Sequence, residues 1–74
     1  MFTERATDLA RHCTEAVRSG KHFPTVWHMF IKGHALVEGI PRQRLDGTRA
    51  LLDIPLVTGQ VLVFDADAKE FRLE

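Results

Sequence analysis

The sequence predicts an α+β fold in one domain spanning residues 1–74, with two helices packed on a three-stranded antiparallel β-meander. Two observations predict this class. Apolar residues recur with a helical period in the first half of the chain, and short apolar runs separated by turn residues follow from residue 50 onward. A chain of 74 residues is also short enough to form a single domain around one core.

The first predicted element is a helix over residues 3–19. Thr3 suits the N-cap, Glu4 suits the positive end of the helix dipole, Arg18 suits the negative end, and Gly20 suits the C′ position. The apolar positions follow the spacing of one helical face. They are Ala6, Leu9, Ala10, Cys13, Ala16 and Val17.

The second predicted element is a shorter helix over residues 23–32. Pro24 would occupy N1 and Gly33 would occupy C′, which is the asymmetry expected of a short helix. A buried strand remains an alternative, because β-branched and aromatic residues favour strands and a buried strand also reads as an apolar run. Residues on the apolar stripe are Phe23, Val26, Trp27, Phe30 and Ile31.

The last third of the chain predicts the meander. Glycine and proline recur at short intervals over residues 33–48, so we expect regular structure to be interrupted there. Strands follow at 50–57, 60–65 and 70–74, and the first of these should lie at a sheet edge because Pro55 cannot donate to a ladder. The predicted core consists of Leu9, Cys13, Val17, Phe23, Trp27, Phe30, Ile31, Leu52, Ile54, Val61, Val63, Phe71 and Leu73.

Charge is distributed unevenly along a chain whose formal net charge is zero. Residues 18–49 contain six lysines or arginines and two acidic residues, together with three of the four histidines. Residues 51–74 contain five acidic residues and two basic ones. We therefore place the candidate partner-binding site in the middle third. Its predicted residues are His28, Lys32, Arg42, Arg44 and Arg49.

No set of residues indicates catalysis, so we expect a protein that is not an enzyme and has no catalytic residues. Cys13 lies on the apolar stripe of the first helix, where a thiol behaves as a small hydrophobe, and Ser19 lacks a nucleophile-elbow context. The histidines at 22, 28 and 34 do not share a helical face, and no zinc or phosphate-binding motif occurs. We expect no metal, no cofactor and no small-molecule substrate.

Two kinds of macromolecular partner fit the charge pattern. A dipolar molecule with arginines in its middle third suits contact with another protein or with a second copy, as a small regulator or adaptor. The alternative is a nucleic-acid-binding protein of winged helix-turn-helix-like layout that uses the basic segment 32–49. The acidic turn at Asp65 and Asp67 counts against that alternative, because it would repel phosphate.

The sequence also predicts a cytoplasmic protein without a membrane partner. No apolar run approaches the roughly 20 residues that a spanning helix requires. The first residues include acidic side chains rather than the basic and apolar regions of a signal peptide. A single cysteine excludes an intramolecular disulfide and fits a reducing compartment.

Overall fold

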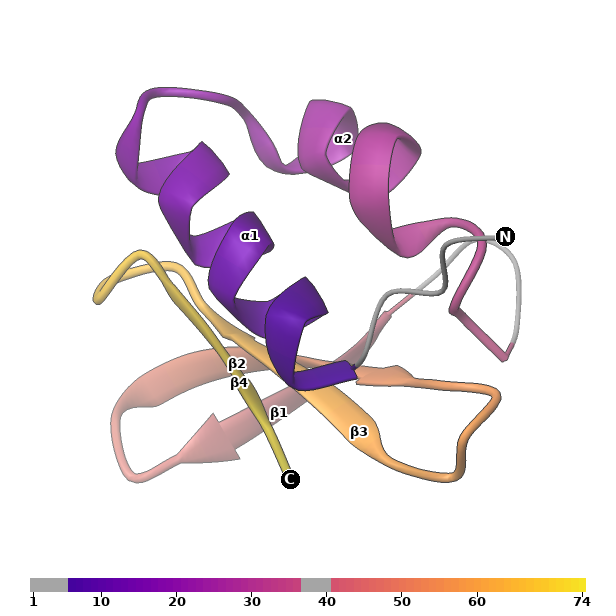
Figure 1. Ribbon diagram of the computed structural model, residues 1–74. Helices are drawn as coiled ribbons and strands as arrows, with labels where there is room; N and C mark the ends of the chain where they lie inside the picture. The colour runs from indigo at the N-terminus through magenta and orange to yellow at the C-terminus, as the bar shows by residue number, and fades with distance from the viewer. Residues whose placement is uncertain (1–5, 37–40) are drawn as a thin grey trace.

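A computed structural model describes residues 6–36 and 41–74 and shows a helical layer over one face of an antiparallel sheet (Figure 1). The elements in chain order are α1 (Ala6–Arg18), α2 (Phe23–Val26), the π-helix η1 (Trp27–Ile31), β1 (Arg42–Asp46), β2 (Arg49–Pro55), β3 (Val61–Asp65) and β4 (Glu70–Leu73). The α+β class is confirmed. The predicted number of strands is wrong, because the sheet has four strands in the order β1-β2-β3-β4.

Helix α1 buries the predicted apolar stripe and ends as its sequence predicts. Gly20 has φ of 103°, and the N–H groups of Gly20 and Lys21 donate to the carbonyls of Val17 and Ala16. This pair of bonds is the Schellman motif, in which glycine takes the left-handed conformation without a Cβ clash. The predicted N-cap, Thr3, lies outside the described residues.

The second segment is helical rather than extended, so the helix prediction for residues 23–32 is confirmed over α2 and η1. Pro24 sits in the first turn, as the second residue of α2 and not at the predicted N1. The end of the segment winds more widely, because the N–H of Lys32 donates to the carbonyl of Trp27 five residues earlier. Gly33 does not take a positive φ, so it does not act as a left-handed C-cap.

Strand β1 is the element that the sequence prediction missed. It occupies part of the segment that was expected to be irregular and pairs with β2 from Arg42↔Asp53 to Asp46↔Arg49. Gly47 and Thr48 connect the two strands, and only Gly47 of the two has a positive φ, 65°. This pattern is a type II′ hairpin turn, whose twist matches that of the flanking strands.

The prediction that the strand containing Pro55 lies at an edge is wrong, because β2 lies between β1 and β3. Pro55 is the last residue of β2 and lies beyond Asp53, where the pairing with β1 stops. Its missing N–H therefore interrupts no β1–β2 bond. Its carbonyl accepts a hydrogen bond from the N–H of Leu36.

The core lies between the helices and one face of the sheet. Phe23, Phe64 and Phe71 stack there, with ring centroids of Phe64 and Phe71 4.4 Å apart. Strand β3 has the opposite phase from the prediction, because Leu62 and Phe64 join this core whereas Val61 is only partly buried. Val63 is buried, as predicted, but on the opposite face of the sheet.

The remaining predicted core residues pack as expected, either buried in the cluster or partly buried against it. Leu9, Cys13, Val17, Ile31, Ile54 and Phe71 are buried, and Phe23, Trp27, Phe30, Leu52 and Leu73 pack against them. Trp27 is therefore a core residue, whereas Met29 is 53% exposed. Ala10, Ala16, Val26 and Leu56 also belong to the cluster, although the predicted core did not include them.

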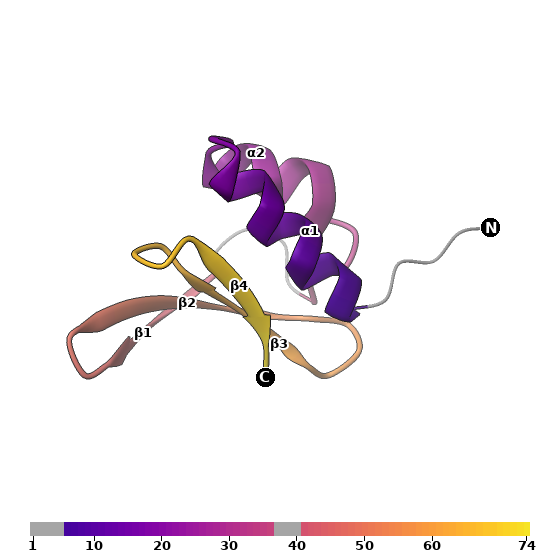
Figure 2. The same cartoon turned by 60° about the vertical axis from the view of Figure 1, so that its left-hand side comes forward.

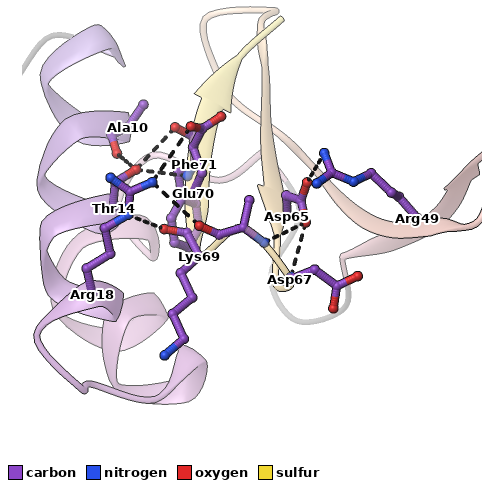
Figure 3. A network of polar contacts seen from close by, with 10 residues as sticks. Ala10, Thr14, Arg18, Arg49, Asp65, Asp67, Lys69, Glu70 and Phe71 are labelled. Atoms are coloured by element: carbon purple, nitrogen blue, oxygen red, sulfur yellow. Dashed lines mark hydrogen bonds and ion pairs between the residues drawn. The ribbon is translucent and has the colours of Figure 1, made fainter.

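Helix α1 seals the outer edge of β4 through two polar side chains (Figure 3). The hydroxyl of Thr14 accepts a bond from the N–H of Phe71 at 2.8 Å and lies 2.8 Å from the carbonyl of Ala10 and 3.2 Å from that of Phe71. Arg18 donates to the carbonyl of Lys69 at 3.0 Å. The outward backbone groups of Phe71, in the middle of this edge, are therefore satisfied within the chain.

Candidate functional site

The β1–β2 hairpin (residues 42–55) carries three of the five predicted partner-binding residues. It extends away from the helical layer (Figure 2). Arg42 and Arg44 alternate along β1, and Arg49 begins β2. By the cross-strand register all three share the sheet face opposite the helices. We call this face, with its charged side chains, the outer face.

The other two predicted residues lie elsewhere. His28 belongs to η1 and Lys32 follows it, and both are exposed in the helical layer. The structure therefore does not gather the five predicted residues on one surface. It groups Arg42, Arg44 and Arg49 on the outer face and separates them from His28 and Lys32.

Carboxylates on neighbouring strands hold Arg44 in place. Its Nε lies 3.1 Å from an oxygen of Asp53, although the N–H is not directed at it, and its Nη2 lies 3.3 Å from Glu74. Burial acts to lower the pKa of Arg44, but attraction to Asp53 and the hydrogen bond to Glu74 outweigh it and raise that pKa above its usual value. The guanidinium is therefore a fixed cation with its counter-charge beside it.

The same interactions act on Glu74 from the other side. Hydrogen bonding to Arg72 lowers the pKa of the Glu74 carboxyl, burial opposes this, and Arg44 adds to the lowering. Glu74 is thus held by two arginines, at 3.1 Å from Arg72 and 3.3 Å from Arg44.

Arg49 forms an ion pair with a buried carboxylate. Its guanidinium lies 3.0 Å from Oδ2 of Asp65, a residue that is only 2% exposed (Figure 3). The other oxygen of Asp65 accepts bonds from the N–H groups of Asp67 and Ala68 in the β3–β4 turn, each at 3.1 Å. Asp65 therefore joins that turn to the first residue of β2, next to the Gly47-Thr48 turn of the hairpin.

Charged residues on the outer face surround two apolar ones. Leu51 and Val63 are 2% and 0% exposed although they lie on the face opposite the helices. The cross-strand neighbours of Leu51 are Arg44 and Asp65, and Arg72 lies opposite Val63. The aliphatic parts of arginine side chains can cover apolar groups in this way. Arg44 and Arg49 thus have a structural role besides any role in binding.

The helix-side face of the hairpin is apolar and open. Leu45 is 75% exposed there. A hollow of about 510 Å³ borders it, and its lining residues are Gln43, Arg44, Leu45, Ala50, Leu51, Leu52 and Ala66. This surface was not predicted from the sequence, because no strand was expected before residue 50. Gly47-Thr48, with glycine at the first position of a two-residue connection, is a hairpin signal that could have revealed it.

The residues considered for chemistry are dispersed. Cys13 is buried in α1, and the hydroxyl of Ser19 donates to the carbonyl of Ala16. Within residues 6–36 and 41–74 no three His, Cys, Asp or Glu side chains gather as metal ligands would. The segment 42–49, which the nucleic-acid alternative would use for recognition, is a β-hairpin rather than a helix.

Comparison with protein-family models, with curated proteins and with solved structures found no match. Among the described residues, none of the helices has the length and apolar character needed to cross a membrane.

Proposed function

We propose that this protein is a small non-enzymatic regulator or adaptor that acts through protein–protein contact, with the β1–β2 hairpin as its contact surface. The observation that carries the proposal is the combination found on the hairpin. An edge strand, the exposed side chain of Leu45 and the apolar hollow beside it lie together, beyond the cover of the helices. Such edges and apolar patches are typical of surfaces that bind another chain.

The charges of the hairpin favour a protein partner over nucleic acid. Nucleic-acid binding draws its affinity from cations that neutralise phosphates. Arg44 and Arg49 already face carboxylates at 3.0–3.3 Å, so the outer face presents charges of both signs. Arg42 is the hairpin arginine without an ion pair among the described residues.

The test is affinity capture from the native cell extract, with and without nuclease, using Leu45→Lys as the disruptive variant. Val57→Lys is the matched control, because Val57 is also an exposed apolar residue, at 62%, but lies on the β2–β3 turn. We expect capture that resists nuclease, is lost with Leu45→Lys and persists with Val57→Lys. Capture that disappears with nuclease would support the nucleic-acid alternative instead.

Arg42→Gln tests the predicted arginine contact without disturbing the fold, because Arg42 is exposed and lacks an ion pair among the described residues, whereas a carboxylate at that position would face Asp53 of β2. Arg44→Glu is unsuitable for that purpose, since it would place a third carboxylate beside Asp53 and Glu74. A variant with His28→Ala and Lys32→Ala tests the second predicted group. If that variant alone abolished capture, the contact surface would lie on the helical layer.

A further inference from the structure

We infer that the partner of the β1–β2 hairpin is a second copy of this chain, which pairs its β1 antiparallel to the first across a two-fold axis at Arg44. The two sheets would then form one continuous sheet. This inference rests on the proposed function and names the partner of that surface. It follows from the backbone of β1, from the charges along it and from the apolar hollow beside it.

The backbone of β1 has donors and acceptors directed away from its own sheet. Asp46 and Arg49 close the two-residue turn, and hydrogen-bonded and non-hydrogen-bonded pairs alternate from there along an antiparallel ladder. The N–H and C=O groups of Gln43 and Leu45 therefore point away from β2. Among the described residues, no strand other than β2 pairs with β1.

These outward groups limit the antiparallel registers in which β1 can pair with itself. A two-fold axis at Arg44 places Gln43 of one copy opposite Leu45 of the other, and each such pair exchanges both backbone hydrogen bonds. An axis at Gln43 would set Leu45 opposite Pro41, which has no N–H to donate. An axis at Leu45 would set Gln43 opposite Gly47, which lies in the turn outside β1. The backbone therefore favours the axis at Arg44.

Charge complementarity selects the axis at Arg44. In that register Arg42 of each copy faces Asp46 of the other, and neither residue has an ion pair among the described residues. The two Arg44 side chains face each other at the axis, where Asp53 and Glu74 of each copy balance their charge. An axis at Gln43 would place Arg42 against Arg44 at both symmetric positions and would leave Asp46 opposite no arginine, so it forms like-charge pairs without any opposite-charge pair. An axis at Leu45 would instead bring Asp46 to Arg44, which already holds Asp53 and Glu74.

This arrangement would also partly cover the apolar hollow. A two-fold axis perpendicular to the sheet keeps the helix-side faces of both copies on the same side. Leu45 of the second copy then lies beside Gln43, at the rim of the hollow that Leu45, Ala50 and Leu52 line. Two side chains that are exposed in one chain are partly covered in the pair.

The expected complex is weak, because β1 has only five residues. Stable interfaces usually bury about 1,200–2,000 Å², and short strand pairing buries less. We therefore expect a dissociation constant at or above about 1 μM, and the measurement must extend into the millimolar range.

The decisive experiment is charge exchange followed by sedimentation equilibrium of the full chain. Arg42→Asp and Asp46→Arg each place like charges opposite each other at both symmetric positions, so each should weaken the dimer about tenfold or more. The double variant R42D/D46R restores opposite charges and should recover dimerisation. A wild type that stays monomeric up to about 1 mM, or a double variant no better than the single ones, would overturn the inference.

Cysteine cross-linking tests the register. With the axis at Arg44, the two Arg44 Cα atoms form a non-hydrogen-bonded pair about 4.5 Å apart, within disulfide range. Arg44→Cys should therefore give an oxidised dimer, whereas Leu45→Cys should not, and the wild type controls for Cys13. Cross-linking through Leu45→Cys alone would overturn the register.

The two proposals fail differently. A monomeric wild type whose capture of another protein is lost with Leu45→Lys would refute the second copy and leave the contact surface standing. A monomeric wild type whose capture is unchanged by that variant would refute both. Circular dichroism of every variant establishes that the fold is retained in each comparison.

Discussion

The two edge strands of the sheet, β1 and β4, differ in the contacts that the rest of the chain makes with their backbones. At β4, Thr14 and Arg18 of α1 bond the backbone of Lys69 and Phe71. At β1, the described residues supply a pairing strand on one side only. An unpaired edge is a template for another strand, so proteins normally cover or charge it. The difference indicates that β1 is the edge available to a partner.

The contrast has a simple origin in the placement of the helices. Helix α1 runs beside β4, so a hydroxyl one helical turn from Arg18 reaches the edge backbone (Figures 1 and 3). The β1–β2 hairpin extends away from that layer (Figure 2). Its support comes instead from ion pairs on the outer face, chiefly Arg44 with Asp53 and Arg49 with Asp65.

Among the polar side chains, the largest expected effect comes from Asp65→Ala, because this residue joins the β3–β4 turn to the hairpin. The variant leaves the N–H groups of Asp67 and Ala68 without their acceptor and Arg49 without its carboxylate. We expect a loss of about 2–3 kcal/mol in the free energy of unfolding, measured by urea denaturation. Asp65→Asn keeps an acceptor oxygen and should lose less. Equal losses in the two variants would show that the turn bonds contribute nothing.

Thr14→Val should open the sealed edge. It removes the acceptor for the N–H of Phe71 and retains the volume of the side chain. We expect a loss of about 1–2 kcal/mol and faster hydrogen exchange of the Phe71 amide. Thr14→Ser retains the hydroxyl and serves as the control. Unchanged exchange in the valine variant would contradict the sealing role.

Leu45→Lys should leave the stability of the single chain almost unchanged, because Leu45 is 75% exposed. We expect a shift within about 0.5 kcal/mol at protein concentrations where the chain is monomeric. Leu62→Ala is the contrasting variant, since Leu62 is fully buried, and it should lose about 2–5 kcal/mol. A large loss with Leu45→Lys would mean that the hairpin surface is already covered within the chain.

The smallest effect concerns the pH dependence of the outer face. The pKa of Glu74 is lowered, first by its hydrogen bond to Arg72. Its stabilisation is therefore fully present above the ordinary glutamate pKa of about 4.3 and is lost as the pH falls through the lower folded-state value. NMR titration of Glu74 should give a midpoint below that ordinary value, and Arg72→Gln should move the midpoint upward. An unchanged midpoint in the Arg72→Gln variant would exclude Arg72 as the main cause of the lowered pKa of Glu74.

Helical periodicity and glycine placement predicted the helical layer well. The stripe of α1, its end at Gly20 and the helical state of residues 23–31 followed from local spacing alone. The sheet was harder to predict, because strand pairing depends on partners distant in sequence. Strand β1 has little apolar character, so its sequence predicts an irregular segment. The phase of β3 was reversed because four consecutive residues of it, Leu62 to Asp65, are buried.

The candidate site was only partly predictable for a related reason. Composition identified the arginines of the middle third, and three of them do share one face. It could not show that Asp53, Asp65 and Glu74 would lie beside them, since those contacts follow from the strand register. The apolar hollow depended on a strand that had not been predicted. Whether His28 and Lys32 take part in binding stays a prediction.

The bonds from Thr14 and Arg18 to β4 also set the size that an assembly can reach. A sheet with two open edges can add subunits at both ends, and such growth leads to fibres. With α1 bonded to the middle of β4 at Phe71, β4 is the less accessible edge, and pairing through β1 consumes the more accessible one of the two described edge strands. The assembly then closes at two copies. The hydrogen bonds that Thr14 and Arg18 of α1 donate or accept would thus help to stop the pairing at a dimer, where it would otherwise continue into a polymer.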